Sequence, residues 1–216
     1  MNKSIKELIK IILTKEIIIM SPRSKKANNE IKDERRVQIL QAALNVFIHK
    51  GFAAAKMSDI ASKAGISYGL TYHYFKSKDD MYTEIVKSSL SSMKDELEKI
   101  KELSIKPIDK LKSCAQRILL SIDKKESTGY LFIVVFEALI NDSLPNSADY
   151  ALKNIKYLVD MLSEIIKEGQ EDGQIRNGDP AEIAVTFFSA VFGIASFNVS
   201  GITKKRPDVE MLMRIF

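Results

Sequence analysis

The stretch MSDIASKAGISYGLTYHYFKSK, residues 57–78, predicts two short helices separated by a tight turn. Ser58 suits the N-cap of the first helix, and Asp59 lies in its first turn, where the helix dipole favours an anion. The apolar residues of this helix share one face: Ile60, Ala61 and Ala64. Gly65 follows them, and because glycine adopts positive φ at little cost, it is well suited to end the helix.

The second helix of this stretch is rich in aromatic side chains with polar tips. Ser67 suits its N-cap, and the helix is predicted to extend from Tyr68 to Phe75. Four of its residues combine a ring with a hydrogen-bonding group: Tyr68, Tyr72, His73 and Tyr74. Such rings suit a surface that meets bases and phosphates, and Lys76 and Lys78 follow directly. Two short helices joined in this way predict a helix-turn-helix, whose second helix enters the major groove of DNA.

The residues around this motif resemble the DNA-binding domain of the tetracycline-repressor (TetR) family of bacterial transcription regulators. The resemblance covers residues 35–85 and is carried by RRVQILQAALNVFIHKGF (35–52), MSDIASKAGIS (57–67) and YGLTYHYFKSKDDMY (68–82). Thr71 departs from the larger aliphatic residue that the family usually has at this position. The resemblance implies an all-α fold with an N-terminal three-helix helix-turn-helix DNA-binding domain and a C-terminal helical bundle for ligand binding and dimerisation.

The motif supplies candidate contacts to both the backbone and the bases of DNA. We expect contacts to phosphates from Ser58, Tyr74, Lys76 and Lys78, and contacts to base edges from Tyr68, Gly69, Tyr72 and His73. Ser67, at the start of the second helix, completes the predicted DNA-binding set. For Tyr72 and Tyr74 the alternative is packing against the first helix of the domain, whereas Phe75 is assigned to the core.

The composition bounds the fold class and the chemistry. The 216 residues are 45% hydrophobic with 9 glycines and 5 prolines, and no alternating strand pattern persists, which predicts an all-helical globular fold. The single cysteine, Cys114, cannot form an internal disulfide and is consistent with a reducing cytoplasm. Two histidines and one cysteine form no metal cluster or Cys/His nucleophilic pair, and no phosphate-binding loop motif occurs. We therefore expect no enzyme, no catalytic residues, no metal and no cofactor.

Charge is distributed unevenly along the chain. The net charge of +5 combines +9 in residues 1–78 (15 Lys and Arg, 6 Asp and Glu) with −4 in residues 79–216 (18 and 22). A basic N-terminal part on an acidic remainder indicates a nucleic-acid-binding end joined to another domain. The predicted divisions are a flexible leader and basic arm over 1–33, the DNA-binding domain over 34–78 and the effector-binding and dimerisation domain over 79–216.

The first 36 residues leave two questions open. Residues 1–20 have the pattern of a short amphipathic helix without the features of a signal peptide, so they either attach to a membrane surface or precede a true start at Met20. Ser21–Arg36 is a basic arm, which is either a solvated terminus or a DNA contact. Its cations are Arg23, Lys25, Lys26, Lys32, Arg35 and Arg36.

Periodicity and capping signals place the remaining helices. The predicted ranges are about 34–50, 78–103, 108–124, 145–169 and 180–200, with a capping-box-like pair of Ser77 and Asp80 before the second of them. The apolar segment 130–140 is interpreted as a buried helix, although its periodicity also allows a strand. A further helix is expected to begin near Pro207, and its short length suggests that the chain is truncated.

The predicted helix 180–200 is apolar nearly all round. Asp179, Pro180 and Glu182 supply three agreeing start signals. A helix of this kind is buried on both sides, either across a membrane or between the domain core and a second subunit. We favour the second subunit, because the resemblance implies a four-helix dimer bundle here. The predicted interface residues are Phe188, Val191, Phe192 and Ala195.

These observations predict a dimeric, cytoplasmic, one-component transcription regulator, most simply a repressor. Its expected partners are double-stranded DNA with a palindromic operator, a second copy of the chain and an apolar or amphipathic small-molecule effector, with no membrane. The resemblance implies a linkage in which the effector favours a spacing of the two DNA-reading heads that no longer matches successive major grooves. The alternatives are a ligand-independent DNA-binding or partner-recruiting regulator, and a membrane-tethered regulator.

Overall fold

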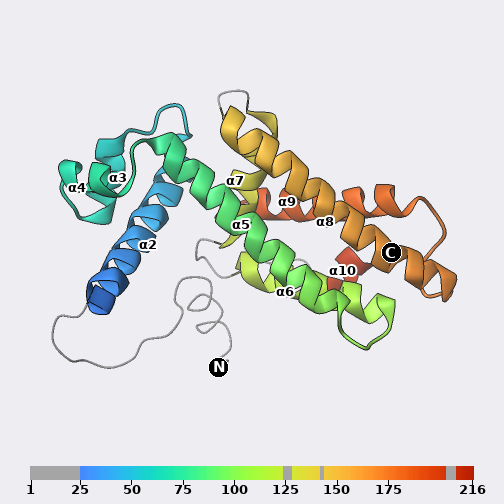
Figure 1. Ribbon diagram of the computed structural model, residues 1–216. Coiled ribbons are helices and arrows are strands. Elements are labelled where there is room, and N and C mark those ends of the chain that lie inside the picture. Colours follow the sequence, from blue (N-terminus) through green and yellow to red (C-terminus); the bar gives the residue numbers. More distant parts are fainter. Residues whose placement is uncertain (1–24, 124–127, 142–143, 203–207) are drawn as a thin grey trace. The chain divides into compact units, whose positions relative to one another are not determined.

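The computed structural model describes residues 25–123, 128–141, 144–202 and 208–216, with the backbone alone for residues 25–32, 123, 128, 145 and 146. These residues form α-helices joined by turns, which confirms the predicted all-α fold (Figure 1). The chain divides into two compact units, one ending at Met81 and the other spanning Tyr82–Phe216. Residues 1–20, and Arg23 of the basic arm, lie outside the described residues.

The first unit contains α2 (Lys25–Lys50), α3 (Met57–Ala64), α4 (Tyr68–Tyr74) and the first turn of α5 (Lys78–Lys101). The helix predicted from about residue 34 begins earlier, at Lys25. The physical reason is that no proline or glycine lies between residues 25 and 50, so nothing in the sequence interrupts the helix there.

The core of the first unit forms where α2 packs against α3. Phe47 is 1% exposed, and its ring lies 5.6 Å from the ring of Phe52 in the turn that follows α2. Phe75 is 3% exposed, which confirms its assignment to the core. Thr71 is fully buried although it is small and polar, because its hydroxyl donates to the carbonyl of Ser67 at 3.3 Å. The departure from an aliphatic residue is therefore tolerated without an unpaired hydroxyl.

The second unit holds the rest of α5 and five further described helices. These are α6 (Pro107–Asp123), α7 (Thr128–Ile140), α8 (Pro145–Glu171), α9 (Pro180–Val199) and α10 (Val209–Met213). The apolar segment 130–140 is helical rather than a strand, and α7 packs against both α8 and α9. The predicted start of α9 is confirmed, because the carboxylate of Asp179 accepts from the backbone N–H groups of Ala181 (2.8 Å) and Glu182 (3.1 Å).

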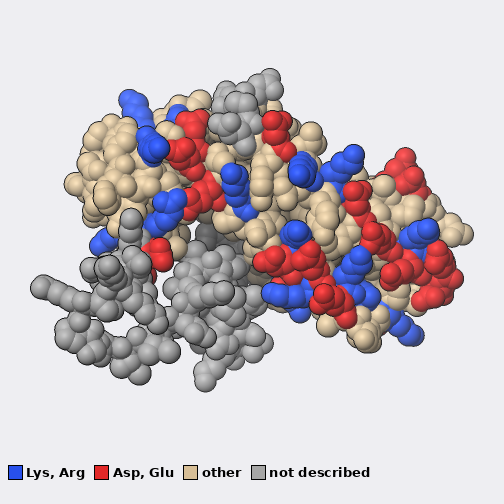
Figure 2. Space-filling model, in the orientation of Figure 1, with Lys and Arg blue, Asp and Glu red and all other residues tan. Residues whose placement is uncertain are grey.

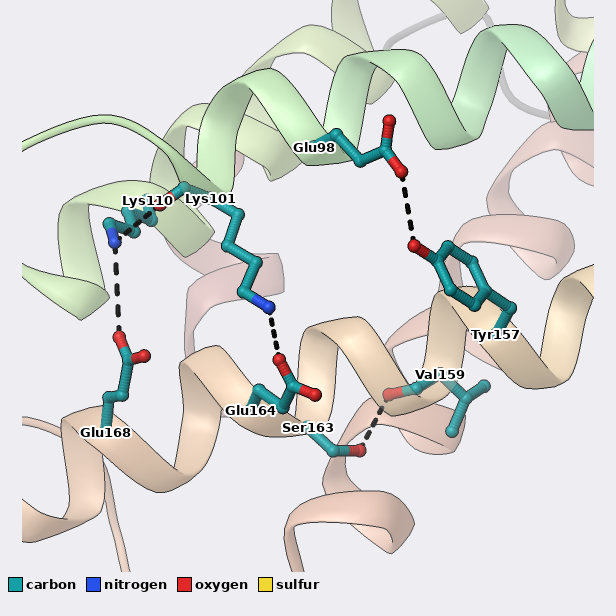
Figure 3. Close-up of polar contacts among 8 residues, drawn as sticks. All are labelled: Glu98, Lys101, Lys110, Tyr157, Val159, Ser163, Glu164 and Glu168. Atoms are coloured by element: carbon teal, nitrogen blue, oxygen red, sulfur yellow. Dashed lines mark hydrogen bonds and ion pairs between the residues drawn. The ribbon is translucent and has the colours of Figure 1, made fainter.

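A ladder of long side chains sets the register between α5 and α8. Three contacts repeat every seven residues on both helices: Lys87 over the ring of Tyr150, Lys94 over the ring of Tyr157, and the ion pair of Lys101 with Glu164. Tyr157 also donates to Glu98 at 3.2 Å, as Figure 3 shows. Because both residue numbers increase together, the two helices run in the same direction. Each of these contacts is partly exposed to solvent. The three contacts therefore fix the alignment of the two helices but add little to the free energy of unfolding.

The inward face of α9 contains the four residues that were predicted to form the subunit interface. Seven of its residues are buried within a single chain: Ile183, Ala184, Phe187, Phe188, Val191, Phe192 and Ala195. Val191 and Ala195 are fully buried within one chain, and their contact with a second subunit stays a prediction. Phe188 and Phe192 keep 8% exposure, and the ring of Phe192 lies 5.4 Å from that of Phe136 on α7. An apolar pattern that continues round the helix does not specify which face turns inward.

Candidate nucleic-acid interface

The turn between α3 and α4 has the geometry that its sequence predicts. Gly65 adopts φ 65°, in the left-handed region, and the N–H of Ile66 donates to the carbonyl of Ala61 at 3.0 Å. Ser67 is the N-cap of α4, and its hydroxyl accepts from the N–H of Leu70 at 3.3 Å. These local bonds end one helix and start the next within three residues, which produces the compact helix-turn-helix.

The start of α3 differs from the prediction by two residues. The N-cap is Lys56 rather than Ser58, and the Asp59 carboxylate accepts from the N–H of Lys56 at 3.1 Å. Asp59 also pairs with Lys50 at 2.8 Å. The side-chain bond to Lys50, and then the backbone bond from Lys56, lower the pKa of Asp59. The start of α3 is therefore stabilised by Asp59 in its first turn and not by Ser58. The aspartate side chain is long enough to accept a hydrogen bond from the backbone N–H of the N-cap residue.

Three long polar side chains of this unit donate hydrogen bonds to backbone carbonyls, two at the ends of helices and one in a turn. Gln38 on α2 donates to the carbonyl of Ala64 at 2.8 Å, at the end of α3. Arg36 donates to the carbonyl of Tyr74 at 3.0 Å, at the end of α4, and its guanidinium lies 4.2 Å from the centre of the Phe75 ring. Lys78 bonds to the turn that follows α2. Carbonyls at helix ends lack intrahelical partners, so these bonds fix the orientation of α3 and α4.

Most of the predicted DNA-binding residues are exposed on α3 and α4. The exposed members are Ser58, Ser67, Tyr68, Gly69, Tyr72, His73 and Lys76, with Tyr68 at 54% and Tyr72 at 44% exposure. Tyr74 and Lys78 are half-buried. The exposure of Tyr72 favours its role as a contact over packing, whereas Tyr74 has its ring 5.5 Å from that of His73 and its carbonyl bonded to Arg36.

Tyr68 and Tyr72 form a paired unit on the outer face of α4. Their rings pack edge to face with centroids 5.0 Å apart, and their hydroxyl oxygens lie 3.1 Å apart. The hydrogen bond to Tyr68 raises the pKa of the Tyr72 hydroxyl above its ordinary value. The pair therefore presents two hydroxyls that remain able to bond to base edges or phosphates, on rings whose positions support each other.

An open hollow of about 450 Å³ gathers several of these residues. Its lining comprises Ala55, Lys56, Met57, Ser58, Tyr68, Tyr72, Lys76, Ser77, Lys78 and Asp79. Five predicted DNA-binding residues therefore share one concave surface, whereas Ser67, Gly69, His73 and Tyr74 lie outside its lining. The first turns of α3 and α5 also border it, and helix N-termini attract anions. Lysines, hydroxyls and helix starts in one hollow suit a phosphate group.

Five of the ten lining residues were not among the predicted contacts, Lys56 and Ser77 among them, and two of the cations expected near DNA bond to backbone carbonyls. Lys56 and Ser77 line the hollow because they directly precede α3 and α5, and the capping positions could have indicated this. Arg36, expected in a basic arm, is turned inward to the end of α4, and Lys78 is bonded to backbone carbonyls. Arg35 bonds to Gln38 at 2.8 Å on the surface.

Acidic groups belong mainly to the second unit. On the face that Figure 2 shows, Asp and Glu side chains gather toward the C-terminal end of α8. Among the described residues, no group of three or more His, Cys, Asp or Glu is arranged to hold a metal ion. The charge pattern and the exposed aromatic helix together point to the first unit as the part that meets a polyanion.

Comparisons with known proteins agree with this geometry. Residues 39–85 match the family model "Bacterial regulatory proteins, tetR family". The HTH-type transcriptional repressor KstR2 of Mycolicibacterium smegmatis is 30% identical over 144 residues, which are 66% of this chain and 68% of that protein. The fatty acid metabolism regulator protein of Bacillus subtilis is 25% identical over 157 residues, 71% of this chain and 77% of that protein.

A solved structure of similar fold is the MbdR regulator from Azoarcus sp. CIB, with a TM-score of 0.72 and 19% identity over 84% of this chain and 96% of that one. The matched residues 39–85 contain α3, α4 and the turn between them, and the relatives named above extend the match into the second unit. On this evidence the chain belongs to the tetR family of bacterial regulatory proteins, which bind DNA and regulate transcription.

Proposed function

We propose that the chain is a dimeric, cytoplasmic repressor that binds a palindromic operator and is released by a small molecule held in the second unit. The hollow of the first unit carries the DNA-binding part of this proposal. There Ser58, Lys76 and the Tyr68–Tyr72 pair converge beside two helix starts, as a phosphate and its neighbouring bases require. The relative that is named a repressor supports the sign of regulation.

The outer face of α9 supports the dimer. We use this name for Val185, Ser189, Ser196 and Phe197, which are exposed and follow one side of the helix. After Glu182 the helix contains no charged residue, although surface helices normally carry charge on their solvated face. Small serines between larger apolar groups allow a second helix to approach closely. A second copy of the chain on this face would cover Val185 and Phe197, which are now about half exposed.

A dimer would explain strong and specific binding to DNA. Each helix-turn-helix reads one half-site, and two heads on one palindrome share a single association entropy. An effector that favours a different spacing of the heads weakens the binding of both at once. For the effector we propose an amphipathic molecule with an acyl chain, because a relative of this chain is named a fatty acid metabolism regulator.

Selection from a random pool of DNA duplexes tests the proposal directly. The purified full chain should enrich duplexes that contain an inverted repeat, with half-site centres about one helical turn apart or a multiple of this. The matched control is Tyr72→Ala, which removes an exposed ring of α4 without removing a contact in the core. Recovery of no common sequence, or of sites without two-fold symmetry, would contradict operator binding by two heads.

A panel of ligands then tests release. Fatty acids and acyl-coenzyme A thioesters of several chain lengths are added to the complex with the selected duplex, and coenzyme A alone is the control. We expect the binding ligands to raise the melting temperature of the free protein and to lower its affinity for DNA. A panel in which no compound changes either quantity would favour the ligand-independent or partner-recruiting alternative.

The membrane-tethered alternative rests on α9 itself. By length and composition α9 could span a bilayer, with a mean hydropathy of 1.6 over a window that is 33% buried in the structure. Seven of its residues pack inside the second unit, which favours a soluble arrangement. Purification without detergent decides between the two: a protein that stays in solution supports the proposal, and one recovered only from membranes overturns it.

A further inference from the structure

The ammonium group of Lys78 is bonded to the backbone of a neighbouring turn. Its Nζ lies 2.7 Å from the carbonyl oxygen of Phe52, 3.1 Å from that of Ala53 and 3.2 Å from that of Ala55. The same group lies 4.4 Å from the centre of the Phe52 ring. All of these contacts fall within the first unit. A cation at the surface of a DNA-binding domain is usually assumed to face phosphate, but this one faces protein.

The number of donors decides what Lys78 can do. An ammonium group has three N–H donors, and the three carbonyls use all of them. A direct hydrogen bond to a phosphate would require one of these bonds to break. In contrast, Lys76 is exposed at the same hollow, and its side chain is placed to meet solvent or DNA.

These bonds join two parts of the hollow that are far apart in sequence. Residues 55–58 form one side of its lining and residues 76–79 another. Lys78 stands at the start of α5, and the turn it holds leads directly into Lys56, the N-cap of α3. The position of Ser58 relative to Lys76 therefore depends on the bonds made by Lys78.

We propose that Lys78 is a positioning residue: its ammonium holds the turn before α3 against the start of α5, sets the spacing of the phosphate-binding groups, and leaves the phosphate contact to Lys76 and Ser58. This inference rests on DNA binding by the first unit, and it requires neither the dimer nor the effector. The shape of the cation matters here, because three converging carbonyls match the tetrahedral ammonium and not the planar fork of a guanidinium.

Replacement by arginine separates positioning from phosphate contact. Arginine keeps the charge and binds phosphate at least as well as lysine, so a phosphate-contacting Lys78 would tolerate Lys78→Arg. We expect instead that Lys78→Arg lowers the affinity for the selected duplex by about tenfold, the weight of one hydrogen bond to a charged donor. Lys76→Arg, at the lysine assigned to the phosphate, should lose much less affinity than Lys78→Arg, and Lys153→Arg, at an exposed position of the second unit, is the control for the exchange itself. Affinity is measured well below the melting temperature of each variant, where circular dichroism shows it to be folded.

The salt dependence of binding provides the second readout. Lys76→Ala should lower the log–log salt slope by about one unit for each bound subunit, because one phosphate contact is lost. Lys78→Arg should leave the slope unchanged while affinity falls. A Lys78→Arg protein with full affinity, or one whose loss of affinity is explained entirely by an unfolded fraction, would overturn the proposal.

Chemical rescue keeps the test decisive if Lys78→Arg folds poorly. Lys78→Cys is made in a Cys114→Ala background and alkylated with 2-bromoethylamine, so that the thiolate displaces bromide and the product carries an ammonium at nearly the lysine position. We expect alkylation to restore both the melting temperature and the affinity for DNA, and alkylation with iodoacetamide to restore neither fully. The melting temperatures are measured without DNA, so the comparison of the two alkylated proteins does not depend on DNA binding. If the first unit did not bind DNA at all, the unchanged protein would show this by itself. Equal recovery with both reagents would refute a specific role for the ammonium.

Discussion

The helices α4 and α9 are held in place by opposite kinds of interaction. In α4 only Thr71 is buried, and the helix is fixed by the Ser67 cap and by the bond from Arg36 to its carbonyl end. In α9 seven side chains are buried, and apolar packing against α7 and α8 supplies most of the contacts. The difference shows how one chain can keep a reading surface exposed: α4 is positioned by polar bonds at its ends, which leaves its outer side chains available for DNA.

The largest expected effect comes from removing packing from the inner face of α9. Phe187 is fully buried, so Phe187→Ala should cost about 3–5 kcal/mol of unfolding free energy through lost burial and the cavity left behind. Thr186→Ala is the adjacent control on the exposed face and should change stability by less than about 0.5 kcal/mol. Denaturant unfolding measures both. Equal losses at the two positions would mean that the two faces of α9 do not differ as the structure has them.

A substitution on the outer face of α9 should change the oligomeric state of the protein and not the stability of the monomer. Ser189→Glu places a carboxylate on the exposed side, which a monomer tolerates and a close helix–helix contact does not. We expect a folded monomer in sedimentation experiments, with operator affinity reduced roughly 100-fold or more by the loss of two-headed binding. Ser104→Glu, in the exposed turn after α5, is the control for an added charge. If the Ser189→Glu protein remained a dimer with normal affinity, the subunits would have to meet elsewhere.

Phe192→Glu, on the inner face of α9, should act on folding and not on assembly. With an exposure of 8%, Phe192 packs against Phe132 and Phe136, with ring centroids 6.1 Å and 5.4 Å away. A carboxylate there would be buried within the chain, at a cost of several kcal/mol, so the variant should unfold or aggregate before it yields folded monomers. Near-native circular dichroism for this variant would place the residue at the surface.

The polar bonds that hold α4 should each matter less. Arg36→Met keeps an apolar stem but removes the bond to the carbonyl of Tyr74 and the contact with the Phe75 ring. We expect a loss of about 1.5–3 kcal/mol, the usual contribution of a hydrogen bond from a charged donor. Hydrogen exchange of the α4 amides should increase at the same time. A variant with unchanged exchange would show that the cap at Ser67 is sufficient to hold the helix.

The smallest effect is expected at the start of α3, and it should depend on pH. The bond to Lys50 and the backbone N–H of Lys56 lower the pKa of Asp59 below its ordinary value of 3.8, so its contribution to stability is present at neutral pH. That contribution is lost as the pH falls through the lowered value. Asp59→Asn should therefore lower the melting temperature slightly at pH 7. The difference between the two proteins should disappear in acid, and a difference independent of pH would exclude the ion pair as its cause.

Local signals were sufficient wherever a few neighbouring residues decide the structure. Gly65 ends α3, Ser67 caps α4 and Asp179 caps α9, as predicted, because each acts on backbone groups within three residues. The all-α fold and the helix-turn-helix followed from the same short-range pattern, which left packing against the first helix open as an alternative for Tyr72. The start of α2 was not predicted from such signals. A stretch without proline or glycine only permits a helix, whereas a capping residue marks where a helix begins.

Only the tertiary structure decided which way two kinds of side chain point: those of a helix that is apolar all round, and the long side chains of lysine and arginine. The sequence by itself determined that α9 must be buried, but a helix with apolar residues all round has no preferred inner face, and packing against α7 and α8 turned Val191 and Ala195 inward. Lysine and arginine adjacent to a DNA-binding motif carry the same charge whether they meet phosphate or protein. The carbonyls that bind Lys78 and Arg36 lie 23 or more residues away in the chain, so their partners could be known only once the helices were in place.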